Sequence, residues 1–202
     1  MRGELVVVGA GGHAKVVVAT ARAAGFRVAA IVDDARARWG EPLAGLVVSG
    51  PSDPILQDPA AQVVLAIGAN RARRARAQGA RCRFVCIVHP SVILDDTVQL
   101  GAGSVVFAGA VIQPDAVIGA HAIVNTGASI DHDCVLGEAV HVGPGTRLAG
   151  NVTLGDEVFL GIGAVVVPGV AIGARTTIGA GAAVVGDLPA DIVAFGVPAR
   201  AR

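Results

Sequence analysis

The segment Ile118-Gly-Ala-His-Ala-Ile-Val124-Asn-Thr-Gly-Ala-Ser-Ile130-Asp-His-Asp-Cys-Val-Leu136 carries an aliphatic residue at every sixth position. The same spacing continues in both directions, and every position in the series is Leu, Ile or Val. The series comprises Leu94, Leu100, Val106, Ile112, Ile118, Val124, Ile130, Leu136, Val142, Leu148, Leu154, Leu160, Val166, Ile172, Ile178 and Val184. A period of six fits neither an α-helix nor a flat strand, but it is typical of a parallel β-helix of hexapeptide repeats.

Each hexapeptide is expected to form a short strand and a corner, with its aliphatic side chain pointing into a three-sided prism. Glycine follows the aliphatic residue in about half of the hexapeptides, and Asn125 and Asp131 take that place in two others. We expect a left-handed corner at this position. Three hexapeptides would close one coil of about eighteen residues, so the stretch predicts about five coils with strands about 4.8 Å apart.

The composition excludes several classes of protein. The chain has 202 residues, more than half of them apolar, and a formal net charge of zero. That charge argues against a nucleic-acid-binding surface, and no apolar run is long enough to span a bilayer. The start, Met1-Arg2-Gly3-Glu4, lacks the features of a signal peptide. Cys82, Cys86 and Cys134 have no metal-ligand spacing, so we expect reduced thiols and a cytoplasmic location.

Residues 1–90 predict a small α/β domain. Strands are expected at 5–8, 26–32, 63–67 and 83–88, with helices after the first and third, which makes one βαβαβ half of a doubly wound sheet. The second of these helices carries four arginines, which we expect on a solvated face: Arg71, Arg73, Arg74 and Arg76. Residues 91–202 would form the β-helix, ending in a Pro- and Gly-containing tail that lies over the last coils as a strap.

The turn Gly9-Ala10-Gly11-Gly12-His13-Ala14 matches G-x-G-x-x-A, and the next strand ends in Asp33-Asp34. One interpretation is a tight turn that needs glycine, and the other is a phosphate site at a helix N-terminus. An NAD-dependent oxidoreductase is disfavoured, because about 90 residues hold only half of a dinucleotide-binding fold. A site for one nucleoside diphosphate fits the available space better.

The most polar run of the solenoid, residues 125–134, contains the candidate catalytic group. His132 has the side chain best suited to general-base work near neutral pH, and Asp133 could orient its ring. Gly150 follows His132 by one predicted coil, so its N–H could donate to an oxyanion beside the imidazole. Cys134 occupies the inward small position of its hexapeptide, which favours a core role over a nucleophilic one.

His141 lies nine residues after His132, half a predicted coil away. The two imidazoles are therefore not expected to meet within one chain. A threefold oligomer that packs prism against prism could bring His141 of one subunit to His132 of the next. A shared role for the two histidines therefore predicts a homotrimer with sites between subunits.

Taken together, these features resemble the family of sialic acid O-acetyltransferases and bacterial nucleotide-aminosugar N-acetyltransferases. The likeness covers nearly the whole chain. It rests on Val8-Gly9-Ala10-Gly11-Gly12-His13, Asp33-Asp34, Ala66-Ile67-Gly68-Ala69-Asn70, His89-Pro90-Ser91, Asn125-Thr126, His132-Asp133, His141-Val142 and Gly196-Val197-Pro198-Ala199. The resemblance implies that the β-helix is left-handed, an exception to the usual rule for β-crossovers.

The resemblance also implies roles for single residues. His132 matches the base, and Asp133 stands where similar members often have Glu. Acetyl-CoA would lie along His141, Ile162 and Ala180. A nucleotide sugar, usually linked to UDP, would contact the N-terminal domain and the polar run through Gly11, Gly12, His13, Asp33, Asp34, Gly68 and Asn125. The family is typically trimeric and needs no metal.

The favoured function is therefore transfer of acetyl from acetyl-CoA to the amine of a nucleotide-linked sugar, with a UDP-4-amino-4,6-dideoxy sugar as the expected acceptor. O-acetylation of sialic acid or another sugar hydroxyl is an alternative, because an amine and a hydroxyl need similar bases. A scaffold or nucleotide sensor without turnover is a third possibility. Polysaccharide biosynthesis and protein glycosylation are both reasonable settings.

Overall fold

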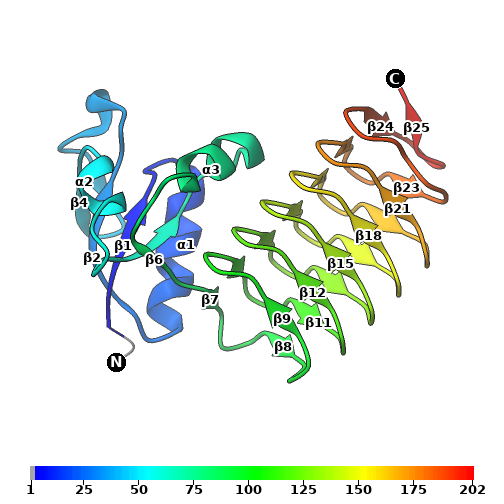
Figure 1. Cartoon of the computed structure of the whole chain (residues 1–202), viewed down its shortest axis with the longest axis horizontal. Coiled ribbons are helices and arrows are strands. Elements are labelled where there is room, and N and C mark those ends of the chain that lie inside the picture. Colours follow the sequence, from blue (N-terminus) through cyan, green and yellow to red (C-terminus); the bar gives the residue numbers. More distant parts are fainter. Residues whose placement is uncertain (1–2) are drawn as a thin grey trace.

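A computed structural model describes residues 3–202, so Met1 and Arg2 of the expected non-signal start lie outside the described residues. Figure 1 shows an α/β unit at one end and a solenoid that extends from it to the C-terminus. The α/β sheet has the strand order β3-β4-β2-β1-β5-β6. Its strands are β1 Glu4–Val8, β2 Arg27–Val32, β3 Pro42–Leu43, β4 Leu46–Ser49, β5 Gln62–Leu65 and β6 Arg83–Phe84, and its helices are α1 Gly12–Ala23, η1 Arg36–Arg38, α2 Asp53–Leu56 and α3 Asn70–Ala77.

The predicted parallel sheet with helices is confirmed, with one addition. The strands β4, β2, β1, β5 and β6 pair in parallel, whereas β3 pairs antiparallel with β4. The β3–β4 hairpin was not predicted, because Pro42-Leu43 and Leu46–Ser49 are too short to show a clear period. Val17 and Val18 of helix α1 are completely buried, because the apolar side of the helix packs against β1 and the first coils of the solenoid.

The solenoid has three parallel faces. We call the one against the α/β unit the docking face: β7 Ile87–Val88, β10 Val105–Val106, β13 Ile123–Val124, β16 His141–Val142, β19 Phe159–Leu160, β22 Thr177–Ile178 and β24 Val193–Phe195, with β25 Arg200–Ala201 antiparallel at its end. The second face comprises β8 Ile93–Leu94, β11 Val111–Ile112, β14 Ser129–Ile130, β17 Arg147–Leu148, β20 Val165–Val166 and β23 Ala183–Val184. The third face comprises β9 Gln99–Leu100, β12 Val117–Ile118, β15 Val135–Leu136, β18 Thr153–Leu154 and β21 Ala171–Ile172.

The hexapeptide rule holds along the whole solenoid, which is a left-handed β-helix. On the second face, Ile93 pairs with Val111 and the pairing continues through six strands to Ala183, so the predicted five coils are confirmed. The aliphatic positions from Val106 to Val184 form one buried cluster together with the small residues beside them. Leu94, the first residue of the hexapeptide series, is exposed at the open first coil.

The position that glycine shares with Asn125 and Asp131 is not the left-handed corner, so that prediction is wrong. Positive φ occurs two residues later, for example at Gly127 (φ 64°) and Asp133 (φ 58°). The glycines directly after the aliphatic residues serve another purpose. A Cβ on them would lie 2.2–2.6 Å from atoms of the next coil or of the tail, so close approach of coils is what excludes a side chain there.

Two boundaries differ from the prediction. The expected single strand over 83–88 is wrong, because β6 ends at Phe84 in the α/β sheet while β7 already pairs with β10 in the solenoid. The tail does lie over the last coils, yet it also extends the docking face, since β24 pairs in parallel with β22. The division of the chain into units 1–90 and 91–202 stays a prediction.

The two units share a continuous apolar core. Ile87, Val105, Phe107 and Ile123 of the docking face belong to the same buried cluster as the inner residues of α1 and β1. The α/β unit is therefore packed on the first coils and is not a pendant domain. Among the described residues, no helix is long and apolar enough to cross a membrane.

Replacement of Gly155 by Ala should destabilise the solenoid by about 1–3 kcal/mol, because the new Cβ would overpack the coil interface. That Cβ would lie 2.5 Å from the backbone nitrogen of Ala174. Urea unfolding at matched protein concentration measures the change. Gly186→Ala is the control, since its Cβ would meet nothing within 4 Å; equal stability of the two variants would contradict the packing argument.

Candidate active site

His132 lies on the corner between β14 and β15, where the chain turns from the second face to the third. Its Nδ1 is 2.7 Å from Oδ2 of Asp133. Its backbone N–H donates to Oδ1 of Asp131 at 2.9 Å. The left-handed conformation of Asp133 folds its carboxylate back toward the preceding ring. The local sequence Asp131-His132-Asp133 thus orients the imidazole without help from another element.

The pairing with Asp133 decides the proton arrangement of His132. An ionised carboxylate can only accept, so Nδ1 carries the proton and Nε2 keeps a free lone pair. The hydrogen bond to Asp133 raises the pKa of His132, and the nearby charge of Asp131 acts in the same direction. An exposed imidazole with one nitrogen anchored and the other free has the arrangement that general-base chemistry requires.

Gly150 lies beneath this imidazole, as its spacing of one coil predicted. A Cβ on Gly150 would lie 2.6 Å from both Cε1 and Nε2 of His132, so no other residue fits there without moving the ring. The neighbouring N–H of Asn151 donates to the carbonyl of His132 at 2.9 Å and holds the two coils in register. The Gly150 N–H donates to no other backbone group within residues 3–202, and it stays the predicted oxyanion donor.

A second polar cluster lies on the docking face. His141 Nε2 is 3.1 Å from Nδ2 of Asn125, and the His13 ring lies 6.2 Å from the His141 ring, centroid to centroid. Phe107 and Phe159 pack edge-on against His13 and His141 respectively. The structure thus joins His13 of the α/β unit to two solenoid residues that the sequence placed only separately.

The hydrogen bonds around Asn125 define the tautomer of His141. Oδ1 of Asn125 accepts the N–H of Thr126 at 2.8 Å, so the amide NH₂ must donate to His141 Nε2. His141 is therefore neutral, with its proton on Nδ1. Burial lowers the pKa of His13 to about 4, and the positive charge of Arg73 lowers it further.

Burial also lowers the pKa of His141 to about 4, with smaller contributions from the charges of Arg73 and His13. The Gly68 backbone carbonyl opposes that shift as an acceptor for the ring N–H, although Nδ1 has no partner of good hydrogen-bond geometry among the described residues. The imidazoles of His13 and His141 are thus both neutral at physiological pH. They can exchange hydrogen bonds with a ligand, but they are poor bases.

The glycine turn and the two acids after β2 face a small cavity of about 190 Å³ lined by Val8, Gly9, Asp33, Asp34 and Ile67. Oδ2 of Asp33 accepts the N–H of Ala10 at 2.7 Å and holds the turn. Oδ1 of Asp34 accepts the backbone N–H of Ser52 at 2.9 Å. Gly11 caps α1 and Gly12 begins it, so both backbone groups lie at the helix N-terminus. Binding of a nucleotide here stays a prediction.

Another cavity, of about 470 Å³, lies one coil beyond His141, between the start of α3 and the docking face. Its lining is Gly68, Ala69, Asn70, Arg71, Glu157, Phe159, Arg175, Thr177 and Asp191. Ile162 and Ala180 do not line it; both side chains are exposed on the corner between the docking and second faces. Their contact with acetyl-CoA stays a prediction, and so does that of His141.

Cys134 is completely buried and its Sγ faces the carbonyl of Ala149 at 3.2 Å, which agrees with the predicted core role. Burial raises the pKa of its thiol, so the thiolate is disfavoured. No group of three or more potential metal ligands occurs among residues 3–202.

The comparisons with known proteins agree with this geometry. The model of the PglD N-terminal domain matches residues 4–79, and that of the bacterial transferase hexapeptide (six repeats) matches residues 151–186. PerB from Caulobacter crescentus, solved with CoA and GDP-perosamine, is 44% identical over 100% of this chain and 98% of its own, with a TM-score of 0.90. The chain belongs to the PglD family of hexapeptide-repeat acetyltransferases.

Other structures of this PglD family have the same fold. The acetyltransferase domain of PglB from Neisseria gonorrhoeae, solved with acetyl coenzyme A, is 36% identical over 98% of both chains, with a TM-score of 0.90. WeeI from Acinetobacter baumannii is 27% identical over 99% of this chain and 100% of its own, with a TM-score of 0.86. A comparison with curated protein sequences finds no match.

One residue that the sequence analysis assigned to a solvated helix face is instead central to the site. Arg73 is only 1% exposed and lies between α3 and the coils that carry His121 and His141, so that prediction is wrong for it. A signal was present in the sequence: Asn70, Arg73 and Arg74 follow the i, i+3, i+4 spacing of one helix face. Because that face carries two arginines, the sequence analysis placed it in solvent and not against the solenoid.

Asp133→Asn should lower the pKa of His132, because the lost carboxylate is the main group that favours the imidazolium. The neutral base would then persist to lower pH. Titration of the His132 ring by NMR measures the shift. Asp115→Asn is a matched control, since Asp115 lies eighteen residues earlier at the equivalent left-handed corner (φ 62°) without a neighbouring histidine. An unchanged His132 titration in Asp133→Asn would contradict the pairing.

Proposed function

We propose that this protein transfers the acetyl group of acetyl-CoA to the amine of a nucleoside-diphosphate-linked sugar. The observation that carries the proposal is full-length similarity, at 44% identity, to an enzyme that holds both CoA and GDP-perosamine. Two variants of that enzyme, in which one histidine is replaced by asparagine or by alanine, have been solved with the same two ligands. The His132–Asp133 pair over Gly150 supplies a base and an oxyanion donor for the reaction.

The proposed reaction is a direct transfer. The sugar amine attacks the thioester carbonyl, and His132 Nε2 accepts the proton that the nitrogen loses as the C–N bond forms. The Gly150 N–H donates to the oxyanion of the tetrahedral intermediate. Collapse of the intermediate breaks the C–S bond, and CoA leaves as the thiol after it receives a proton from the imidazolium. The buried Cys134 takes no part, so no acyl-enzyme forms.

The acceptor would be held by the α/β unit. The cavity beside Asp33 and Asp34 suits a nucleoside, and the start of α1 suits a diphosphate. The sequence predicted UDP as the carrier, whereas PerB holds a GDP-linked sugar, so both carriers belong in the assay. We place the enzyme in the cytoplasm, in polysaccharide biosynthesis or protein glycosylation, where acetyl-CoA and nucleotide sugars are available.

His132→Ala should lower turnover by roughly 10²–10⁴-fold, because the general base is lost. The assay follows CoA thiol release with a GDP- or UDP-linked 4-amino-4,6-dideoxy sugar as acceptor. His89→Ala is the control, since within residues 3–202 the His89 ring forms hydrogen bonds only with Ser91, two residues further along the chain. Unchanged turnover in His132→Ala would contradict the assignment of His132 as the general base. Release with free sialic acid alone would move the function to O-acetylation.

The active site would be completed between subunits of a homotrimer. His132 lies on the corner between the second and third faces of the prism, whereas His141 lies on the docking face. A neighbouring subunit that presents its His132 corner to the cluster of His13, Asn125 and His141 would unite a base with two neutral hydrogen-bonding rings. Threefold packing gives three such sites per assembly.

Mixed assemblies test this arrangement. Co-refolding of His132→Ala with His141→Ala chains should restore about a quarter of wild-type turnover, because one interface in four then pairs intact residues from both subunits. Each variant alone is the control. No restoration in assemblies shown to be mixed by mass spectrometry, or a monomer in sedimentation, would contradict shared sites.

A further inference from the structure

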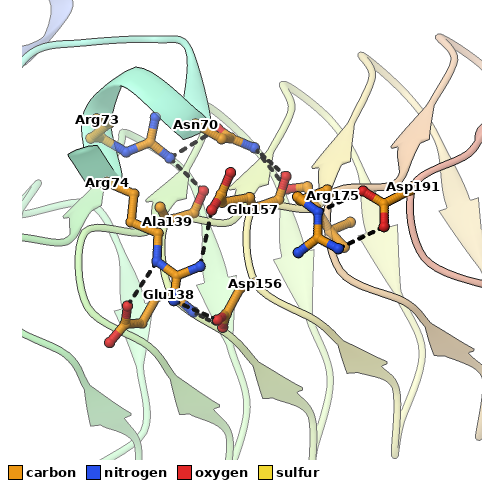
Figure 2. Close-up of polar contacts among 10 residues, drawn as sticks. Asn70, Arg73, Arg74, Glu138, Ala139, Asp156, Glu157, Arg175 and Asp191 are labelled. Carbon is orange, nitrogen blue, oxygen red and sulfur yellow. Dashed lines mark hydrogen bonds and ion pairs between the residues drawn. The ribbon is translucent and has the colours of Figure 1, made fainter.

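Arg73 makes polar contacts to both units. Figure 2 shows its side chain reaching from α3 toward the solenoid beside Asn70. Its Nε donates to the carbonyl of His121 at 2.7 Å, and Nη2 donates to the carbonyls of Ala139 at 2.8 Å and Val140 at 3.3 Å. The guanidinium thus donates hydrogen bonds to two successive coils, just before their docking-face strands begin.

The same guanidinium also holds the loop that follows β5. Its Nη1 donates to the carbonyls of Ile67 at 2.9 Å and Gly68 at 3.2 Å. Gly68 is a predicted contact of the nucleotide sugar, and Val140 directly precedes His141. One planar fork therefore sets the separation between the acceptor-side loop and the imidazole on the acetyl-CoA side.

The charge of Arg73 is unusually poorly compensated. Within residues 3–202 its hydrogen-bond acceptors are all neutral, namely backbone carbonyls and Oδ1 of Asn70. Arg74, the next residue of α3, instead forms ion pairs with Glu138, Asp156 and Glu157 at 2.8–3.1 Å, as Figure 2 shows. A buried cation without a contacting carboxylate is costly to desolvate.

The rings of His13 and His141 lie within the field of this cation. Burial and then the charge of Arg73 lower the pKa of each ring. Among the described residues, the other groups that contact the two rings are uncharged: Phe107, Phe159, Asn125 and the Gly68 backbone. Glu157 acts on Arg73 itself, whose own pKa burial lowers to about 10, so the guanidinium stays charged.

We propose that Arg73 is a positioning residue for acetyl transfer, whose fork sets the distance between Gly68 and His141. Its buried charge adds to the effect of burial in lowering the pKa of His13 and of His141, so that both rings stay neutral. The proposal rests on the proposed acetyltransferase function. A protonated His141 could no longer accept the Asn125 hydrogen bond at Nε2, and a displaced Gly68 would misplace the acceptor. Both substrates would then bind in the wrong geometry.

Three variants separate the fork from the charge. Arg73→Lys keeps a cation but loses the planar fork, so KM for both substrates should rise roughly tenfold or more with an unchanged pH profile. Arg73→Gln loses both, so its KM should also rise as the pH falls from about 7 to 5, because removal of the cation raises the pKa of both rings. Arg74→Gln is the matched control: it removes ion pairs from the same helix without touching Gly68 or Val140.

NMR titration of the His13 and His141 rings gives a readout that needs no activity. The midpoints should move to higher pH in Arg73→Gln and stay in place in Arg73→Lys and Arg74→Gln. Absence of acetyl transfer in the wild type would refute the proposed function, while the ring titrations would still judge the charge effect. If Arg73→Gln does not fold, Arg73→Lys decides alone. Wild-type KM values in Arg73→Lys, or equal titrations in a folded Arg73→Gln, would overturn the proposal.

Discussion

The stacking of one inward aliphatic residue per prism side is the constraint on which the rest of the structure depends. Each of these side chains from Val106 to Val184 packs on the residue eighteen positions away, and the small residues beside them leave space for it. Coils then approach closely enough that a Cβ after the aliphatic residue would collide with the next coil. The polar residues of the site therefore have to lie at corners or on the outward side of strands.

This constraint gives the site its rigidity. His132 and Gly150 meet because a residue and its partner one coil later cannot slip without turning every inward side chain out of the core. The left-handed corner at Asp133 adds a local anchor for the ring. The candidate base is thus held by stacked strands and by its hydrogen bond to Asp133.

The docking of the α/β unit adds a second level of organisation. Its apolar core is continuous with Ile87, Val105 and Ile123 of the first coils, and the arginines of α3 fasten its other side to the next coils. The result is an asymmetric pair of histidine environments. His132 is exposed beside a carboxylate, which raises its pKa. His13 and His141 are buried near a cation, and both effects lower their pKa values and keep them neutral. A candidate base and two neutral hydrogen-bonding rings are obtained from one residue type by environment alone.

Local periodicity determined the solenoid, its five coils and the proximity of His132 to Gly150, because a repeat of fixed length places residues one period apart in contact. The same reasoning identified Cys134 as a core residue. It misplaced the left-handed corners, since glycine serves both for positive φ and for close coil contact and the sequence does not distinguish them. The burial of Arg73 and the meeting of His13 with His141 were decided only by the tertiary structure, because they depend on the angle at which two separately encoded units pack, and no sequence period records that angle.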